Sequence, residues 1–118
     1  MSEQVLLSVG MTMQDGKFEE FQAIVREIVA LAKKEPGTLG YEWYKTSDGK
    51  SWRLIEIYMD ADGLLAHLQG PALKEFPRLM KMASLSGVQV FGEPGPKARE
   101  ILTGMGAEIF SHSVGLRR

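Results

Sequence analysis

The sequence contains no cysteine, so it offers no disulfide, no thiolate nucleophile and no thiolate ligand for a metal. Its longest apolar runs are only a few residues, far below the roughly 20 that span a bilayer. Neither sign of charge dominates, because 14 Lys and Arg side chains face 15 Asp and Glu side chains. That balance leaves no strong field for nucleic acid or anionic lipid. We therefore expect a cytoplasmic protein without nucleic-acid or membrane partners.

The chain of 118 residues is long enough for one hydrophobic core and too short for two. We expect a single domain over residues 1–118. Within it, residues 93–118 form a C-terminal extension. Its apolar residues, Ile101, Leu102, Ile109 and Phe110, suffice for docking but not for a core of its own. The extension is expected to pack on the body of the domain or on a partner subunit.

Alternating apolar residues predict strands over residues 5–13, 38–45, 51–59 and 87–92. Asp48-Gly49 predicts a hairpin between the second and third strands, because this pair tolerates the backbone angles of a tight turn. The alternation divides the third strand into two faces. One face carries Trp52, Leu54, Glu56 and Tyr58, and the other carries Arg53, Ile55, Ile57 and Met59. Both faces are apolar enough to be at least partly buried.

Apolar residues at helical spacing predict a helix from Phe18 to about Glu35, which Pro36-Gly37 ends. Asp60 is placed to cap a second helix beginning at Ala61. Gly70-Pro71 then predicts that this helix is broken in two. Residues 97–103 fit a short helix, and residues 108–111 fit either a short strand or an extended tail.

The order strand, helix, strand, strand, helix, strand is that of the α+β ferredoxin-like split βαβ unit. It predicts a four-stranded antiparallel sheet with helices on one face. Ile55, Ile57 and Met59 would leave the other face too apolar for water. A second copy packed sheet to sheet would bury that face, so we predict a homodimer. The alternative is that a C-terminal segment covers the face within one chain.

Several short segments, in this order and spacing, resemble the antibiotic biosynthesis monooxygenase-like family over roughly residues 4–92. They are Pro36-Gly37-Thr38-Leu39-Gly40-Tyr41-Glu42, Glu56-Ile57-Tyr58-Met59-Asp60, His67 seven residues beyond Asp60, and Val90-Phe91-Gly92. The resemblance implies a dimeric α/β barrel with a pocket between sheet and helices in each subunit. It implies no single activity, because similar proteins include oxygenases, haem-degrading proteins, isomerase-like relatives and proteins without an assigned role.

We predict no cofactor and no metal. Haem-degrading relatives carry an asparagine on the first strand, a tryptophan at the end of the third and a haem-ligating histidine in the second helix. This sequence has no asparagine, Tyr58 takes the tryptophan position, and Phe76-Pro77 falls where the histidine would be. Glycines do not form a phosphate-binding loop, and no cluster of histidines or carboxylates has metal-ligand spacing.

Glu56 and His67 are the candidate catalytic residues. Burial raises the pKa of a carboxylate, which could make Glu56 a general base near neutral pH. The alternative is a structural acid paired with Arg53, Lys45 or backbone amides. His67 can accept a proton with little adjustment, and Glu56 would then orient His67 or the substrate. A capped or merely polar histidine is the structural alternative.

Four aromatic side chains around the hairpin are the candidate substrate-binding residues: Tyr41, Trp43, Trp52 and Tyr58. Their flat surfaces suit an aromatic or polyketide-like ligand, although core packing explains such residues equally well. The sequence therefore indicates a cofactor-independent monooxygenase-like enzyme acting on a small aromatic metabolite. A non-catalytic small-molecule binder and a stress-related structural dimer remain alternatives. Neither the ligand nor the pathway follows from the residues.

Overall fold

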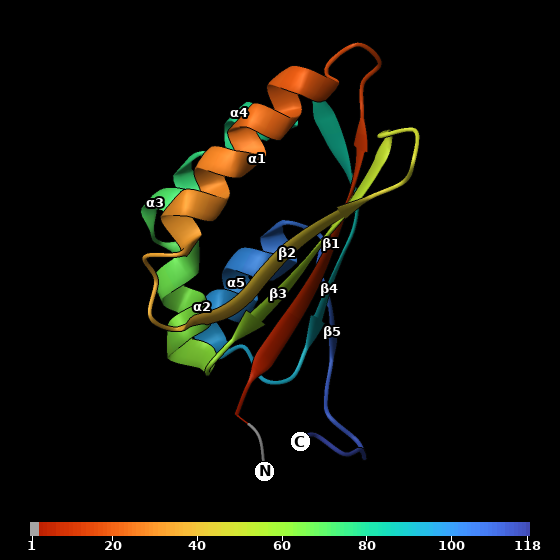
Figure 1. The fold of residues 1–118 in the computed structure, drawn as a ribbon. Coiled ribbons are helices and arrows are strands. Elements are labelled where there is room, and N and C mark those ends of the chain that lie inside the picture. The colour runs from red at the N-terminus through yellow and green to blue at the C-terminus, as the bar shows by residue number, and fades with distance from the viewer. Residues whose placement is uncertain (1–2) are drawn as a thin grey trace.

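Five strands form one mixed sheet in the computed structural model, which describes residues 3–118. The strands are β1 (Val5–Met13), β2 (Thr38–Lys45), β3 (Ser51–Tyr58), β4 (Ala83–Phe91) and β5 (Glu108–Phe110), in the spatial order β2-β3-β1-β4-β5 (Figure 1). The predicted ferredoxin-like antiparallel sheet is confirmed for β1 to β4, and β5 adds a fifth strand parallel to β4. Met1 and Ser2, part of the predicted domain, lie outside the described residues.

The helices cover one face of this sheet (Figure 1). They are α1 (Phe18–Ala32), α2 (Ala61–Leu68), α3 (Pro71–Lys74), α4 (Phe76–Met80) and α5 (Pro96–Gly104). Asp60 caps α2 as predicted, because its Oδ1 accepts a hydrogen bond of 2.8 Å from the Gly63 N–H. Among residues 3–118, no helix is long and apolar enough to cross a membrane.

Two sequence predictions need correction. The helix after Asp60 is divided into three pieces rather than two. Pro71 is the first residue of α3 and Pro77 the second residue of α4, and proline cannot continue the preceding helical hydrogen bonds. The strand predicted over 87–92 spans Ala83–Phe91. Its first half lacks a clear apolar alternation, and Gly87 has a φ of 152° near a register shift in the pairing with β1.

The inner face of the sheet is apolar along nearly its whole length. All five predicted inward residues of β1 are buried: Val5, Leu7, Val9, Met11 and Met13. On β3 the inward residues are also buried, including the carboxylate of Glu56. On β2, the alternation of the sequence places Leu39 on one face with Tyr41 and Trp43, but Leu39 is 51% exposed because the pairing of β2 with β3 shifts register between Thr38 and Gly40.

The outer face of the sheet keeps the apolar character predicted for it. Ile55 and Ile57 are half-buried, and Met59 is half-exposed. At the opposite edge, the rings of Phe91 and Phe110 stack with centroids 5.3 Å apart while both remain exposed. No segment among residues 3–118 covers Ile55 and Ile57 completely. Part of this apolar face is therefore exposed to solvent.

The C-terminal extension contributes to the core through α5. Ala98 and Leu102 are buried against Val5, Tyr58 and Val90. Beyond β5 the chain leaves the sheet, and Val114 and Leu116 are highly exposed.

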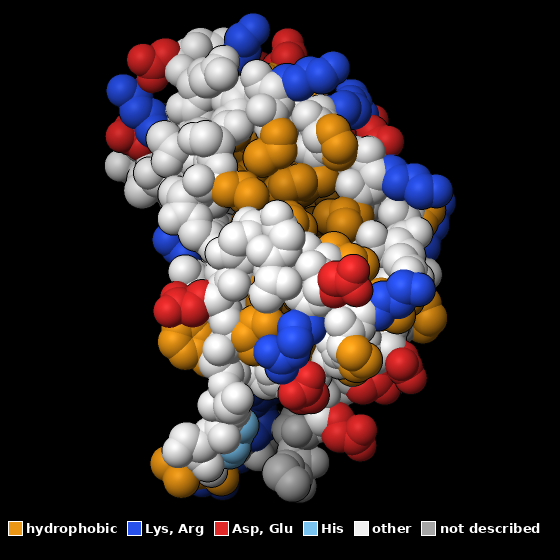
Figure 2. Space-filling view, turned by 180° about the vertical axis from the view of Figure 1, so that it is seen from behind, with side chains coloured by type: hydrophobic (Ala, Val, Ile, Leu, Met, Phe, Trp, Pro, Cys, Tyr) orange, Lys and Arg blue, Asp and Glu red, His pale blue; other side chains and the backbone are white. Residues whose placement is uncertain are grey.

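Some hydrophobic side chains of α4, β4 and the segment after α5 pack against the core but stay partly exposed: Phe76, Met80, Leu85 and Ala107. Seen from behind, hydrophobic side chains form one group on the upper half of the surface, bordered by charged side chains (Figure 2). Residues 3–118 therefore leave part of this apolar surface exposed.

Candidate active site

Four polar side chains, those of Glu35, Glu56, Tyr58 and His67, meet at one end of the sheet's inner face. His67 on α2 lies between two carboxylates, with its Nδ1 2.8 Å from Glu35 Oε1 and its Nε2 3.7 Å from Glu56 Oε1. The Tyr58 hydroxyl donates a short hydrogen bond to that same oxygen of Glu56. Glu56, Tyr58 and His67 are 4% exposed or less. The cluster is therefore shielded from solvent.

A pair of glycines brings the segment after α1 against the start of α2. A Cβ on Gly37 would lie 2.7 Å from the Gly63 Cα, and a Cβ on Gly63 would lie 2.9 Å from the Gly37 carbonyl oxygen. That oxygen also accepts a hydrogen bond from the Met59 N–H. Only glycine permits this approach, which places Glu35 beside His67.

Burial raises the pKa of Glu56, since desolvation penalises the carboxylate, while the charge of His67 and the hydrogen bond from Tyr58 partly oppose this. The pKa values of Tyr41 and Tyr58 are also raised, chiefly by burial and then by the charge of Glu56. Both phenols therefore stay protonated and can act as hydrogen-bond donors. Glu56 can hold a proton at a higher pH than an exposed carboxylate.

Glu35 orients the imidazole. When Nδ1–H donates to Glu35 Oε1, the lone pair of Nε2 is left free to accept a proton. The same oxygen of Glu35 also accepts a 2.8 Å hydrogen bond from the Thr38 hydroxyl, which fixes the carboxylate. Because 3.7 Å is longer than a hydrogen bond, Nε2 can accept a proton from another group while Glu56 stabilises the imidazolium.

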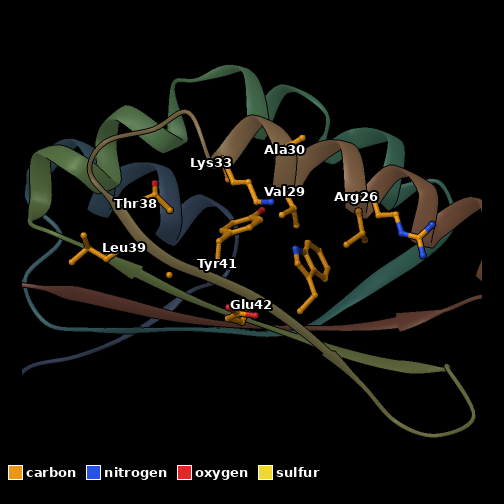
Figure 3. Close-up of a pocket in the computed structure, with 12 residues that line it drawn as sticks. Arg26, Val29, Ala30, Lys33, Thr38, Leu39, Tyr41 and Glu42 are labelled. Carbon is orange, nitrogen blue, oxygen red and sulfur yellow. The ribbon is translucent and has the colours of Figure 1, made fainter.

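A pocket of about 640 Å³ opens between α1 and β2, next to this cluster. Arg26, Val29 and Ala30 line it from α1 and Lys33 from the C-cap of that helix, and Tyr41 extends from β2 toward the helix (Figure 3). Trp43 and Thr38 are also lining residues. The volume is within the range of small-molecule pockets.

Two lining residues connect the pocket with the buried cluster. The Tyr41 ring packs against the His67 ring, with centroids 5.4 Å apart, and Thr38 hydrogen-bonds to Glu35. The catalytic candidates therefore lie directly behind one wall of the pocket.

The structure brings the two predicted catalytic residues, Glu56 and His67, together. The ion pair between Glu56 and Arg53, considered as the structural alternative, is absent, because Arg53 lies on the outer face and donates to Ser8 Oγ at 3.1 Å. Of the four aromatic candidates, Tyr41 and Trp43 line the pocket, whereas Trp52 and Tyr58 do not.

Sequence analysis missed Glu35 and Thr38. Both lie beside Pro36-Gly37, a pair that ends the first predicted helix and opens one segment of the family resemblance, and neither residue has a predicted role in the site. The available signal was an acidic residue immediately before that turn and a hydroxyl immediately after it. Among residues 3–118, no group of three histidine, cysteine or acidic side chains is arranged to hold a metal ion.

Residues 5–79 match the sequence model of a family described as antibiotic biosynthesis monooxygenase. The chain belongs to this family. No functionally curated protein sequence matches it. The resemblance inferred from short motifs is thereby confirmed, and the matched span includes Glu35, Glu56 and His67 of the buried cluster.

Solved structures support the antibiotic biosynthesis monooxygenase fold. MupZ from Pseudomonas fluorescens is 26% identical, with a TM-score of 0.86, and the match covers 100% of this chain and 91% of MupZ. SnoaB, a cofactor-independent oxygenase from Streptomyces nogalater, is 18% identical, with a TM-score of 0.68 and coverage of 80% and 97%. Rv0793 from Mycobacterium tuberculosis is 18% identical, with a TM-score of 0.67 and coverage of 79% and 97%.

Proposed function

We propose that the protein is a cofactor-independent monooxygenase acting on a small aromatic or polyketide-like metabolite in the pocket between α1 and β2. The observation that carries the proposal is the carboxylate–imidazole–carboxylate arrangement of Glu35, His67 and Glu56 behind the pocket wall. Membership of the family and the similarity in fold to SnoaB, a cofactor-independent oxygenase, are consistent with this chemistry.

In the proposed reaction, an activated phenol or enol loses a proton to His67 Nε2, and the resulting carbanion-like anion reduces dioxygen. For an anthrone-type substrate, the ring CH₂ group and O₂ become a ring carbonyl and water, so one oxygen atom enters each product. The protein contributes desolvation, orientation and proton transfer. Glu35 holds the imidazole, and Glu56 stabilises its protonated form.

Access to His67 depends on Tyr41. His67 is 2% exposed, and the Tyr41 ring both packs on it and lines the pocket. In the proposal, the substrate ring stacks on Tyr41 and Trp43, and a turn of the Tyr41 side chain brings the acidic hydrogen to Nε2. The hydroxyl of Tyr41 makes no hydrogen bond with residues 3–118 and is free to donate to the substrate.

The test is oxygen uptake with a panel of hydroxylated aromatics such as anthrones, without added flavin or metal. Loss of a general base typically costs about 10²–10⁴-fold in rate, so His67→Ala should remove most turnover, and Glu56→Gln should also lower it. His112→Ala is the matched control, because His112 is exposed in the tail. Circular dichroism and thermal melting should confirm that the variants fold. Turnover equal to wild type in both site variants would show that these roles are wrong.

The burial of His67 also favours the second candidate, a small-molecule binder without turnover. In that function the same pocket holds an aromatic metabolite, and the polar cluster has a structural role. If the wild-type protein consumes no oxygen with any compound of the panel but binds one of them tightly, the binding function is favoured over the enzymatic one. Mass spectrometry of molecules that copurify would identify the ligand class in either case.

We also propose that the protein acts as a homodimer joined through the outer face of the sheet. Ile57 lies on that face near the end of β3, opposite Leu6 on β1 and Gly40 on β2. Ile57→Asp would place an unpaired charge in the interface and should shift the dimer to monomer in light scattering. Ala23→Asp adds the same charge on exposed α1 as a control. A monomeric wild type, or an unchanged dimer in Ile57→Asp, would contradict this assembly.

A further inference from the structure

Two cations without ion-pair partners line the pocket, Arg26 on α1 and Lys33 at its C-cap. Arg26 and Lys33 are exposed, and neither forms a salt bridge with any of residues 3–118. Seven residues apart, they lie on one side of the helix, with Val29 and Ala30 between them along the pocket. Their Cα atoms are about 10 Å apart at the helical rise per residue. The helix wall is therefore apolar in the middle and positive at both ends.

The opposite wall is aromatic and carries hydrogen-bond donors. Tyr41 and Trp43 of β2 line it, with ring centroids 6.2 Å apart. The ring N–H of Trp43 is buried and finds no acceptor among residues 3–118. Glu42 is the acidic lining residue, but the register places it on the outer side of β2, opposite Ile55. Its carboxylate therefore does not neutralise the helix wall.

The two ends of the pocket differ in their relation to the buried cluster. Lys33 reaches over Tyr41, whereas Arg26 lies at the far end with its guanidinium directed outward (Figure 3). Because the Tyr41 ring packs on His67, the Lys33 end is where the reacting group must be. The Arg26 end is left for a part of the ligand that does not react, and a guanidinium pairs best with a planar carboxylate.

We propose that the ligand is an elongated aromatic carboxylic acid, with its carboxylate at Arg26 and its phenol or enol oxygen at Lys33 and Tyr41. Such an acid would be the substrate class of the proposed oxygenase. The placement of its reacting end at Lys33 and Tyr41 rests on that proposed function. Lys33 stabilises the oxyanion that forms when the substrate loses its proton, and Arg26 selects acids over neutral rings.

Binding is measured anaerobically by calorimetry, so that no turnover contributes. The probes are a naphthoic acid with hydroxyl and carboxyl groups at opposite ends, its methyl ester, and the phosphate monoester that replaces the carboxylate. An exposed or partly desolvated ion pair is worth up to about a kilocalorie per mole, which is up to roughly fivefold in affinity. Wild type should bind the acid about two- to fivefold more tightly than the ester, and the phosphate no more tightly than the acid.

Arg26→Gln should remove the preference for the acid, and Lys34→Gln should retain it. Lys34 is exposed and follows Lys33 directly, but it does not line the pocket, so it controls for the loss of one positive charge. Equal affinity for acid and ester in wild type would overturn the proposal, as would an equal loss of preference in both variants. Tighter binding of the phosphate would overturn the assignment of a carboxylate.

The two proposals can fail separately. If the protein binds the acid more tightly than the ester but consumes oxygen with no substrate, the oxygenase function is contradicted and the acid-binding pocket is supported. The opposite result is oxygen uptake with neutral anthrones at a rate that Arg26→Gln does not change, together with equal binding of acid and ester. It would support the oxygenase function and contradict the proposed carboxylate site.

Discussion

Trp52 and Tyr58 lie on the same inner face of β3, near its two ends, and both are buried aromatic side chains. Their surroundings differ. Trp52 packs against Phe18 and Phe21, with centroids 6.0 and 5.0 Å away, and its ring N–H donates to the Gly49 carbonyl oxygen at 2.8 Å. Tyr58 instead donates to Glu56, and its ring lies 5.3 Å from the ring of His67.

The Trp52 end of β3 stabilises the fold, whereas the Tyr58 end carries groups that can transfer a proton. At the Trp52 end, burial removes apolar surface from water, and the polar N–H is satisfied. At the Tyr58 end, the protein buries a carboxylate, which is costly unless it is paired. One oxygen of Glu35 is also buried without a hydrogen-bond partner among residues 3–118. Such departures from a well-satisfied core are expected at functional sites.

The largest expected effect on stability is at the aromatic end. Trp52→Ala removes a ring that is 6% exposed and contacts Phe18, Phe21 and Trp43. Removing a large buried aromatic side chain typically lowers the free energy of unfolding by about 3–5 kcal/mol. Urea denaturation measures this loss, and oxygen uptake by the fraction that remains folded should stay near wild type. A loss of turnover without a loss of stability would show that Trp52 belongs to the site, which would contradict the distinction between the two ends of β3.

A smaller effect is expected at the polar end, on rate rather than stability. Glu35→Gln preserves the shape of the side chain but removes the charge that faces His67 Nδ1. A hydrogen bond to a charged group is worth about 1.5–3 kcal/mol, so turnover should fall roughly 10–100-fold, less than in His67→Ala.

The kinetic constants distinguish positioning from a purely structural role for Glu35. Because Glu35 contacts the imidazole and not the pocket, Glu35→Gln should lower kcat and leave KM near the wild-type value. Thr38→Val is the companion variant, because it removes the second hydrogen bond to Glu35 but leaves the charge. An unchanged kcat in Glu35→Gln would mean that Glu35 does not act through His67.

Local patterns accounted for most of the fold. The alternation in β1 and the capping position of Asp60 each depend on neighbouring residues, and both were predicted correctly. The errors occurred where local and tertiary preferences differ. The first half of β4 has a weak alternation but is held by its pairing with β1, and Leu39 turns outward at a register shift that only the partner strand defines.

The candidate site was predictable only in part. Glu56 and His67 stood out because a carboxylate on an apolar strand and a single histidine in the body are unusual. Glu35 was not visible in the same way, because it lies 32 positions from His67 and meets it only through the close approach of Gly37 and Gly63. Trp52 and Tyr58 occupy the same face of one strand, so the sequence alone could not show which of them packs in the core and which contacts the polar cluster.

The smallest expected effect is a change in how stability depends on pH. Glu56 has a pKa raised above its ordinary value of 4.5, chiefly by burial. As pH rises through 4.5, the unfolded chain releases this proton while the folded protein retains it, so the folded state binds more protons and stability falls. Below 4.5 both states are protonated and Glu56 contributes no slope; above the folded pKa the loss is complete.

Glu56→Gln removes this titration, so the free energy of unfolding of the variant should rise relative to wild type as pH increases from below 4.5 toward neutrality. The slope of the difference cannot exceed about 1.4 kcal/mol per pH unit, the value for one proton. Urea midpoints measured across this range test it. Glu19→Gln, on the exposed side of α1, is the control for the loss of one carboxyl group. Parallel curves for Glu56→Gln would mean that the buried carboxyl titrates at its ordinary pKa, and the polar end of β3 would then be no more than a satisfied ion-pair cluster.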